Sequence, residues 1–185
     1  MYLIVGLGNP EPEYSKTRHN VGFDALNLVA SKYKIDVNKK GFDGLYGIGE
    51  IEGEKVILLK PQTYMNLSGK SIAQIKNFYK IPDENMIVSY DDIDLGEGVV
   101  KIRKKGGAGT HNGMRSIINE LHTTNFPRVR IGTGMPEYKE MLVSYVIEKL
   151  KDEEYEKLVP AIEKAAKDIT DIVKHGVDYA MNLNN

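Results

Sequence analysis

The 185-residue sequence contains no cysteine. This absence excludes disulfides, thiol nucleophiles, iron–sulfur clusters and cysteine-ligated zinc, so the chemistry of the protein must come from other side chains. Long apolar runs are absent as well, because no segment approaches the roughly 20 apolar residues that span a bilayer. The short apolar start, MYLIVGLGNP, has no basic stretch before it, unlike a secretory signal. We therefore expect a cytoplasmic protein that does not associate with a membrane.

An excess of charge of one sign is also lacking. The sequence has 25 Lys and Arg residues against 26 Asp and Glu residues, a net charge of -1. A protein with this balance does not bind nucleic acid by its overall charge, so such binding would need a local basic patch. The composition, 41% hydrophobic and 28% charged, is ordinary for a globular protein. We expect residues 1–185 to form one domain with a substantial core.

The hydrophobic pattern predicts strands that alternate with helices. Strands are expected over residues 2–5, 45–51, 55–60, 86–90, 99–103 and 127–132. Helices are expected over 21–34, 66–79, 112–121 and from 139 onward, where 152–175 carries one apolar stripe. Residues 35–44 are polar and glycine-punctuated, which is typical of a loop. The order predicts a single α/β domain with a mixed, mostly parallel β-sheet, helices on both faces and a long C-terminal helix.

Polar side chains follow several of the expected strands. They are Asn9, Asn66, Asp91, and the pair His111 and Asn112. Because ligands of open α/β sheets bind at the carboxyl ends of the strands, these side chains can converge although the sequence separates them. An asparagine amide both donates and accepts while staying neutral, which suits an uncharged polar substrate. The alternative is that these asparagines occupy turns and helix N-caps, where they satisfy backbone groups.

His19 lies just before the first expected helix. An imidazole with an ordinary pKa of about 6.5 is a natural general base at neutral pH, and Asp91 could orient it as the carboxylate of a catalytic triad does. A purely structural histidine is the alternative. The acidic run could instead bind a hard cation such as magnesium through Asp91, Asp92 and Asp94.

Two glycine motifs resemble phosphate loops, but each lacks a glycine that its pattern requires. Gly6-Leu7-Gly8 begins a dinucleotide fingerprint, but the third glycine of that motif would fall at Glu11. Ser68-Gly69-Lys70-Ser71 ends like a Walker loop, but the first glycine would fall at Tyr64. Neither motif therefore supports nucleotide binding.

A basic region flanks the third glycine-rich loop, Gly106–Gly109. Basic side chains beside such a loop and a helix N-terminus favour phosphate binding. Strand alternation puts Lys101 and Arg103 on one face, and Arg128 and Arg130 repeat the pattern. The alternative is a solvated strand face. The basic residues of the region are Lys101, Arg103, Lys104, Lys105, Arg115, Arg128 and Arg130.

Taken together, these segments resemble the bacterial peptidyl-tRNA hydrolase family. The resemblance covers nearly the whole chain in the right order, and Thr-Arg-His-Asn and Met-Asn-Leu-Ser-Gly are its most specific motifs. The segments that carry it are Gly6–Pro10, Tyr14 with Thr17–Gly22, Tyr64–Gly69, Asp91 with Asp94–Leu95, Gly106–Gly113 and Arg128–Gly132.

The resemblance implies an esterase that needs no metal or other cofactor. It would hydrolyse the bond between a peptide and tRNA, with His19 as the base that activates water and Asp91 as its partner. We also expect a monomer with no obligate protein partner. The implied substrate-binding residues are Asn9, Tyr14, Tyr64, Met65, Asn66, His111 and Asn112. The implied tRNA contacts are Lys101, Arg103, Lys104 and Arg130, with Arg103 and Arg130 around the 5′-phosphate.

The chain departs from the usual family pattern at four positions. Glu11 and Thr110 replace glycines, Tyr90 replaces a histidine, and Asp92 replaces a glutamate. None of them is a proposed catalytic side chain, so the departures concern loop geometry and substrate preference rather than the reaction.

Three other functions remain open from the residues alone. A non-catalytic RNA-binding module would bind tRNA without cleaving the ester. A metal-dependent hydrolase built on the acidic run would lose activity with a chelator. A nucleotide-binding oxidoreductase is disfavoured by the broken glycine fingerprint.

Overall fold

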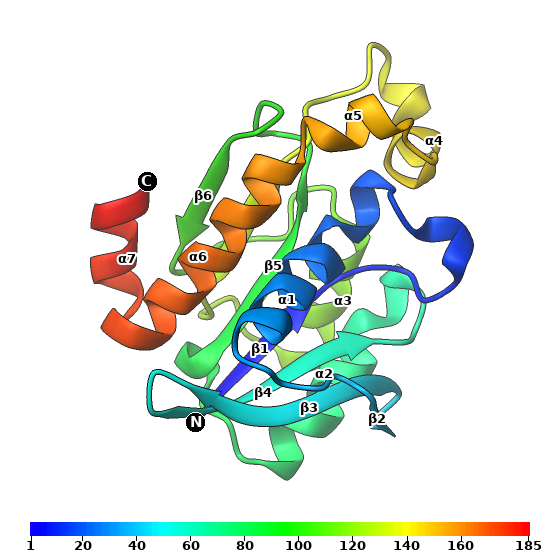
Figure 1. Cartoon of the computed structure of the whole chain (residues 1–185). Helices are drawn as coiled ribbons and strands as arrows, with labels where there is room; N and C mark the ends of the chain where they lie inside the picture. Colours follow the sequence, from blue (N-terminus) through cyan, green and yellow to red (C-terminus); the bar gives the residue numbers. More distant parts are fainter.

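The computed structural model describes residues 1–185 as a seven-stranded sheet in the order β2-β3-β4-β1-β5-β7-β6. The four central strands β4, β1, β5 and β7 are parallel, while β3 and β6 run in the opposite direction (Figure 1). The predicted mixed α/β fold is therefore confirmed. The strands are β1 Tyr2–Gly6, β2 Lys39–Gly41, β3 Gly44–Ile51, β4 Glu54–Pro61, β5 Met86–Asp92, β6 Val100–Arg103 and β7 Arg128–Gly132.

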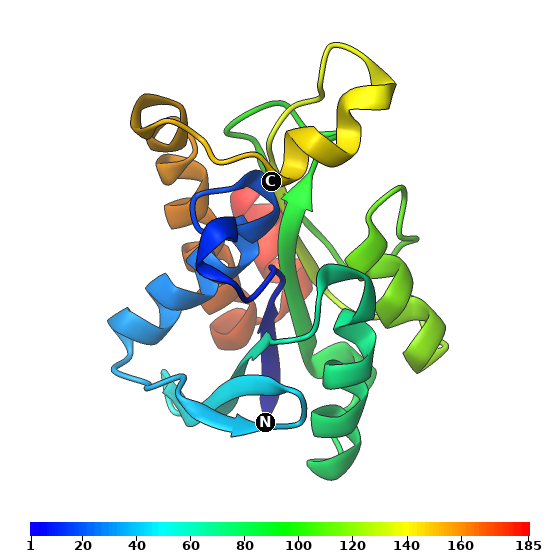
Figure 2. The ribbon, with the colours of Figure 1, turned by 90° about the vertical axis from the view of Figure 1, so that its right-hand side faces the viewer.

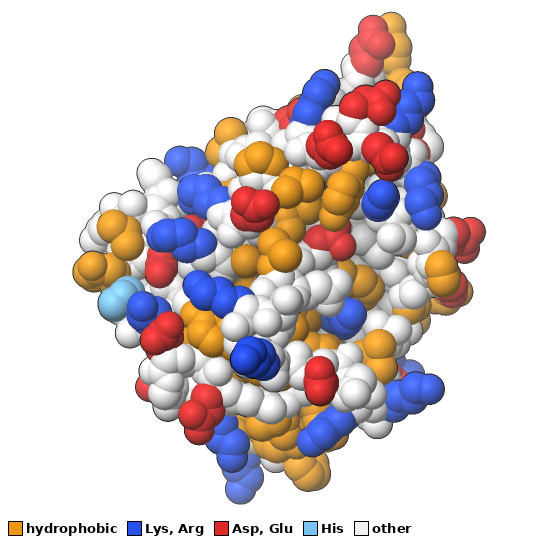
Figure 3. Space-filling view, viewed as in Figure 1, with side chains coloured by type: hydrophobic (Ala, Val, Ile, Leu, Met, Phe, Trp, Pro, Cys, Tyr) orange, Lys and Arg blue, Asp and Glu red, His pale blue; other side chains and the backbone are white.

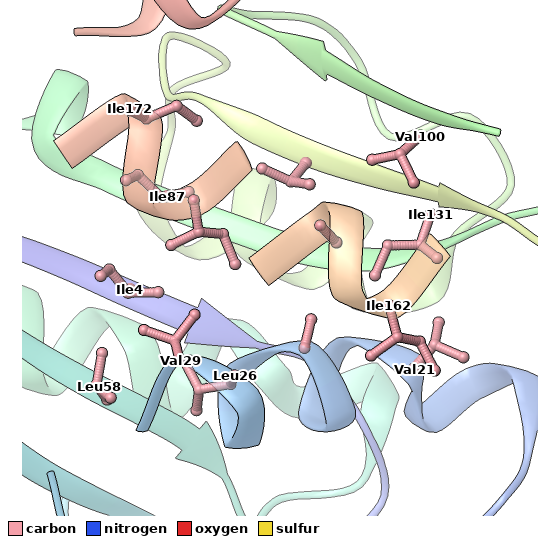
Figure 4. Close-up of a cluster of buried hydrophobic side chains, with 14 of the residues drawn as sticks. Ile4, Val21, Leu26, Val29, Leu58, Ile87, Val100, Ile131, Ile162 and Ile172 are labelled. Atoms are coloured by element: carbon pink, nitrogen blue, oxygen red, sulfur yellow. The ribbon is translucent and has the colours of Figure 1, made fainter. Parts of the chain in front are cut away.

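Helices cover both faces of this sheet. Helices α1 and α6 pack on one face, and α2 and α3 pack against each other on the opposite face (Figure 2). The helices are α1 Val21–Lys32, α2 Ser68–Phe78, α3 Asn112–Leu121, α4 Leu142–Ile147, α5 Asp152–Glu156, α6 Val159–His175 and α7 Val177–Asn184. The larger core cluster joins α1 and α6 to the sheet through side chains such as Leu26, Ile87 and Ile162 (Figure 4). No helix is both long and apolar enough to cross a bilayer.

Two differences from the expected strands have physical causes. Residues 39–41, expected in a loop, form the edge strand β2, which pairs with β3. Its residues are largely exposed and carry no apolar alternation, so the sequence gives no strand signal there. Strand β5 continues through Asp91 and Asp92, which were expected in the following loop. Pairing with Ile131 and Gly132 of β7 extends the ladder despite the low strand propensity of aspartate.

The segment 152–175, expected to be one helix, is divided into two helices, and its apolar stripe lies on the second. Helix α5 ends at Glu156 and α6 begins at Val159, with Pro160 in its first turn. Proline has no amide hydrogen to continue the hydrogen-bond ladder of a preceding helix, so it favours a new start. The long helix α6 is present as predicted. After it, the side chain of Asn185 bonds both the amide and the carbonyl of Ile102, which covers the edge strand β6.

The start of α1 lies directly on the sheet because two glycines remove the side chains between them. A Cβ at Gly6 would lie 2.3 Å from the carbonyl oxygen of Gly22, and one at Gly22 would lie 2.4 Å from that of Ser89. This close approach places the short 3₁₀ turn Arg18–Asn20, just before α1, at the carboxyl end of β1 and β5. The fold therefore brings His19 to the carboxyl end of β5, where Asp91 lies.

Candidate active site

A cleft of about 510 Å³ lies at the carboxyl ends of the central strands. The polar side chains expected to converge there do so, because Asn9, His19, Asn66, Asp91 and Asn112 all line it. Both basic and apolar side chains line the cleft. The basic lining consists of Arg103, Lys105, Arg128 and Arg130, and the apolar lining includes Met65, Ala108, Leu142, Val143, Val146 and Ile147.

The carboxylate of Asp91 lies between two imidazoles at the centre of this cleft. Its Oδ2 is 2.7 Å from Nδ1 of His19, and its Oδ1 is 2.8 Å from Nε2 of His111. Only 1% of the Asp91 side chain is exposed, against 12% for His19 and 9% for His111. The two histidines therefore supply the polar partners that a buried carboxylate requires.

The hydrogen bonds of His111 define its tautomer. His111 is the N-cap of α3, and its Nδ1 accepts a hydrogen bond from the amide of Met114 at 3.2 Å. A nitrogen that accepts carries no proton, so Nε2 must bear the hydrogen that is donated to Asp91. The sequence suggested a substrate contact for His111, but nothing in the sequence indicated this bridge between a helix N-cap and Asp91.

His19 has one ring nitrogen without a hydrogen-bond partner in the protein. Because Nδ1 of His19 donates to Asp91, the lone pair of a neutral ring lies on Nε2, which makes no hydrogen bond within the protein. His19 lines the cleft. This ring therefore has the arrangement that a general base requires, with one nitrogen held and the other free.

The pKa values of this pair are shifted in the directions expected for a hydrogen-bonded couple. Burial alone would raise the pKa of Asp91, but the two adjacent imidazoles hold it well below its ordinary value, so the carboxylate stays ionised. Burial opposes protonation of His19, but the charge and hydrogen bond of Asp91 outweigh it and raise the pKa of His19 above its ordinary 6.5. Burial also raises the pKa of Tyr90 to about 12, so this phenol is not a base near neutral pH.

Asn9 is fixed on both its backbone and its side chain. The side chain of Asn20 accepts from the amide of Asn9 at 2.8 Å and donates to its carbonyl at 3.0 Å. Oδ1 of Asn9 accepts from the amide of Met65 at 2.8 Å, which assigns the other end of the amide as Nδ2. Because Nδ2 has no partner within the protein and Asn9 lines the cleft, it is a positioned donor. The sequence did not identify Asn20, since its role depends on contact with Asn9.

The four departures from the family pattern have identifiable contacts. Glu11 accepts a hydrogen bond from the hydroxyl of Tyr64, and the ring of Tyr90 packs edge-on against His111 with centroids 4.9 Å apart. Asp92 accepts from Nε of Arg130 at 2.6 Å, and Thr110 lines the cleft. Three of the four replacements therefore contact another residue of the site.

The predicted tRNA-binding cations occupy different places. Arg103 and Arg130 line the cleft. Lys101 on β6 pairs in register with Arg130 on β7 and does not line the cleft. Lys104 lies outside the lining and its ammonium is 3.2 Å from the carboxylate of Asp178 on α7. Arg103 is exposed, whereas Arg130 is partly neutralised by Asp92.

Arg128 is not the free cation that strand alternation suggested. Only 2% of this residue is exposed, and its guanidinium donates to the carbonyls of Phe126, Gly107 and Thr124. The strand places Arg128 on the same face as Arg130, as expected, but loop carbonyls occupy its donors. It therefore holds the glycine-rich loop in place beside the cleft.

Tyr14 and the acidic run do not lie where the sequence suggested. Tyr14 does not line the cleft, and its carbonyl accepts a hydrogen bond from Thr17. The acidic run does not gather into one cluster, since Asp92 bonds Arg130 and the amide of Asp94 while Asp91 faces the histidines. The group with ligand atoms close enough to share a cation is instead His19, Asp91 and His111, within 4.8 Å of one another.

Basic side chains are not concentrated on the face of the molecule that carries α1 and α6. Figure 3 shows Lys and Arg intermixed with Asp and Glu across that view, with no broad area of one sign. The cations that line the cleft come instead from β6, β7 and the loop after β6. These residues form a local group of cations at the cleft.

The chain is similar to known peptidyl-tRNA hydrolases along its length. The family model described as peptidyl-tRNA hydrolase matches residues 3–185. A peptidyl-tRNA hydrolase of Clostridium botulinum is 51% identical over 185 residues, which cover 100% of this chain and 96% of the relative. One of Clostridium novyi is 52% identical, with 100% and 98% covered. The crystal structure of peptidyl-tRNA hydrolase from Acinetobacter baumannii has a TM-score of 0.94 at 41% identity, with 100% of this chain and 94% of that chain covered.

The coupling between Asp91 and His19 predicts how the imidazole titrates. In the natural protein, His19 should titrate above pH 6.5. In Asp91→Asn, the charge that favours the imidazolium is removed while burial remains, so its midpoint should fall below 6.5. NMR of the ring protons across pH measures both values. Asp94→Asn, which also lines the cleft but bonds neither ring, is the control and should leave the midpoint unchanged. An equal or higher midpoint in Asp91→Asn would contradict this coupling.

Proposed function

The chain belongs to the peptidyl-tRNA hydrolase family, and we propose that it hydrolyses the ester between a peptide and the 3′ end of tRNA through water activated by His19. The observation that carries the proposal is the single free nitrogen of His19, held by Asp91 at 2.7 Å and presented in a cleft with apolar and basic sides. The product is free tRNA. We further propose that the protein acts as a cytoplasmic monomer.

The first step is the attack of water on the ester carbonyl. Nε2 of His19 takes a proton from the water as its oxygen bonds to the carbonyl carbon, and Asp91 stabilises the imidazolium that forms. Asp91 itself stays ionised because the two imidazoles lower its pKa. An ester is already activated toward attack, so the reaction needs no covalent enzyme intermediate.

The second step is collapse of the tetrahedral intermediate. An amide donor of Asn9 or Asn112 stabilises the negative charge on the former carbonyl oxygen. Nδ2 of Asn9 is the better positioned of the two, because hydrogen bonds to Met65 and Asn20 already fix its orientation. The bond from carbon to the ribose oxygen then breaks, and the imidazolium of His19 returns its proton to that oxygen.

The two ends of the substrate are recognised by different side chains of the cleft. On the peptide side, Asn66 bonds the peptide backbone, and Tyr64, Met65 and the residues of α4 contact its side chains. The ammonium of an aminoacyl-tRNA would enter this partly apolar region without a countercharge, which disfavours it. On the tRNA side, Arg103 and Arg130 contact phosphates, and Lys101 and Lys104 extend the basic surface.

Removing either member of the catalytic pair should abolish turnover without weakening tRNA binding. His19→Ala and Asp91→Asn should each lower kcat by about 10²- to 10⁴-fold, the usual contribution of a general base. Both residues act on the water, so the Kd for tRNA should change little. For the natural protein, kcat should also fall as the pH drops below a midpoint above 6.5, because protonated His19 cannot accept a proton. The measurements are release of tRNA from peptidyl-tRNA and binding of uncharged tRNA.

His175→Ala is the control for removal of an imidazole, because His175 lies at the end of α6, away from the cleft. An arm with EDTA tests whether the cluster of His19, Asp91 and His111 works through a cation. Full activity in His19→Ala, or abolition of turnover by EDTA, would refute the proposed mechanism. Binding of tRNA without any cleavage by the natural protein would favour a binding module.

The basic side should account for the salt dependence of binding. Arg103→Ala should weaken tRNA binding and flatten the log–log dependence of affinity on salt by about 0.7 to 0.9 for each phosphate that the variant no longer neutralises. Arg130→Ala should act in the same direction, although it also frees the charge of Asp92. Asn66→Ala should lower turnover and leave the slope unchanged. The measurement is a salt titration of tRNA binding for each variant.

Lys174→Ala is the matched control for the removal of one cation, since Lys174 is exposed on α6 and does not line the cleft. Its slope should equal that of the natural protein. A changed salt dependence in Asn66→Ala would contradict its assignment to peptide binding. Unchanged salt dependences in both arginine variants would contradict their assignment to tRNA binding.

A further inference from the structure

Helix α4 supplies the apolar side of the cleft and has few contacts of its own with the sheet. Leu142, Val143, Val146 and Ile147 line the cleft from this helix, and 70% of Val143 is exposed. A helix of six residues has little intrinsic stability, so tertiary contacts must hold it. Its main contacts are with the turn that precedes it and with the 3₁₀ turn Arg18–Asn20.

The contact with that turn is made by Arg18. Its guanidinium lies over the ring of Tyr145 at 3.6 Å from the centroid, which is a cation–π contact at close range. Nη1 of Arg18 also donates to the carbonyl of Tyr145 at 2.9 Å and to the carboxylate of Glu148 at 2.7 Å. Only 8% of Arg18 is exposed. Arg18 therefore bonds one ring, one carbonyl and one carboxylate at the C-terminal half of α4.

Tyr145 connects this contact to the sheet. Its hydroxyl donates to the carbonyl of Thr133 at 2.8 Å, and Thr133 directly follows β7. The amide of Thr133 in turn donates to the carbonyl of Asp92 on β5. The ring of Tyr145 thus connects Arg18 to the end of the sheet. This connection sets the distance between α4 and the strands.

The residues before Arg18 and after α4 also contact each other. Thr17 forms a bridge with Lys149, and the amide of Leu150 donates to the carbonyl of Lys16. The segment that follows α4 is therefore attached to the segment that precedes His19. Because Arg18 and His19 are adjacent, the apolar side of the cleft and the free nitrogen of the proposed base are held by one turn.

We propose that Arg18 is a positioning residue, which through Tyr145 holds α4 at the distance from His19 that lets its apolar side chains contact the acyl group of the substrate. This role rests on the proposed ester hydrolysis and adds a specificity determinant to it. Lysine cannot replace arginine here, because a flat guanidinium both stacks on the ring and donates in its plane.

The test compares two substrates that differ only in the acyl side chain. One tRNA is acylated with either N-acetylphenylalanine or N-acetylglycine, and KM and kcat are measured for both. The natural protein should have the lower KM for the phenylalanyl ester, whose side chain reaches α4. Tyr145→Leu and Arg18→Lys should raise that KM by about 5- to 30-fold, as expected when a desolvated cation–π interaction is removed. The KM for the glycyl ester should change little.

Tyr179→Leu, which removes a half-exposed tyrosine on α7, is the matched control and should keep the preference. Tyr145→Phe keeps the ring under Arg18 but loses the hydrogen bond to Thr133, so it should raise the phenylalanyl KM less than Tyr145→Leu does. NMR titration of His19 reports on the base, and its midpoint should stay the same in the Tyr145 variants. Thermal unfolding shows whether each variant is folded.

Two failures are distinguishable. If the natural protein cleaves neither ester, the proposed function is wrong. If it cleaves both but Tyr145→Leu raises KM equally for the two esters, or shifts the His19 midpoint, Arg18 and Tyr145 support the fold generally and the positioning role is wrong.

Discussion

The site depends on one buried carboxylate shared by two imidazoles. Asp91 would be costly to bury without partners, and both of its oxygens are bonded, at 2.7 Å to His19 and at 2.8 Å to His111. Three elements must meet to make this arrangement. Strand β5 extends to place Asp91 at the carboxyl end of the sheet, the N-cap of α3 presents His111, and glycine contacts bring the start of α1 onto the strands. Displacing α1 or α3 would leave one oxygen of the buried carboxylate without its partner.

Around this centre the cleft is lined by cations and apolar side chains from different elements. The cations that line it come from β6, β7 and the following loop, whereas the apolar side chains come mostly from α4. Asn9 lies between the two sides, clamped by Asn20 and bonded to Met65, with one donor free. A substrate that is anionic at one end and largely neutral at the other fits this division. Arg18 contacts α4 through Tyr145 and Glu148, so the apolar side chains of that helix are linked to the turn that contains His19.

The sequence predicted most of the fold and the composition of the site, because apolar periodicity and strand-end polar residues are local signals. It could not predict contacts that depend on a partner. Asp91 lies in β5 because β7 pairs with it, and Arg128 is buried because loop carbonyls reach its guanidinium. The bridge from His111 to Asp91 and the stacking of Arg18 on Tyr145 join residues 20 and 127 positions apart. No local pattern encodes such pairs.

The protonation state of the two imidazoles tests the central arrangement most directly. With ¹⁵N-labelled histidine, NMR above the titration range distinguishes a ring nitrogen that bears hydrogen from one that does not. The structure requires hydrogen on Nδ1 of His19 and on Nε2 of His111, with Nε2 of His19 and Nδ1 of His111 bare. If His19 instead carries its hydrogen on Nε2, it does not donate to Asp91 and its proposed action as the base is contradicted.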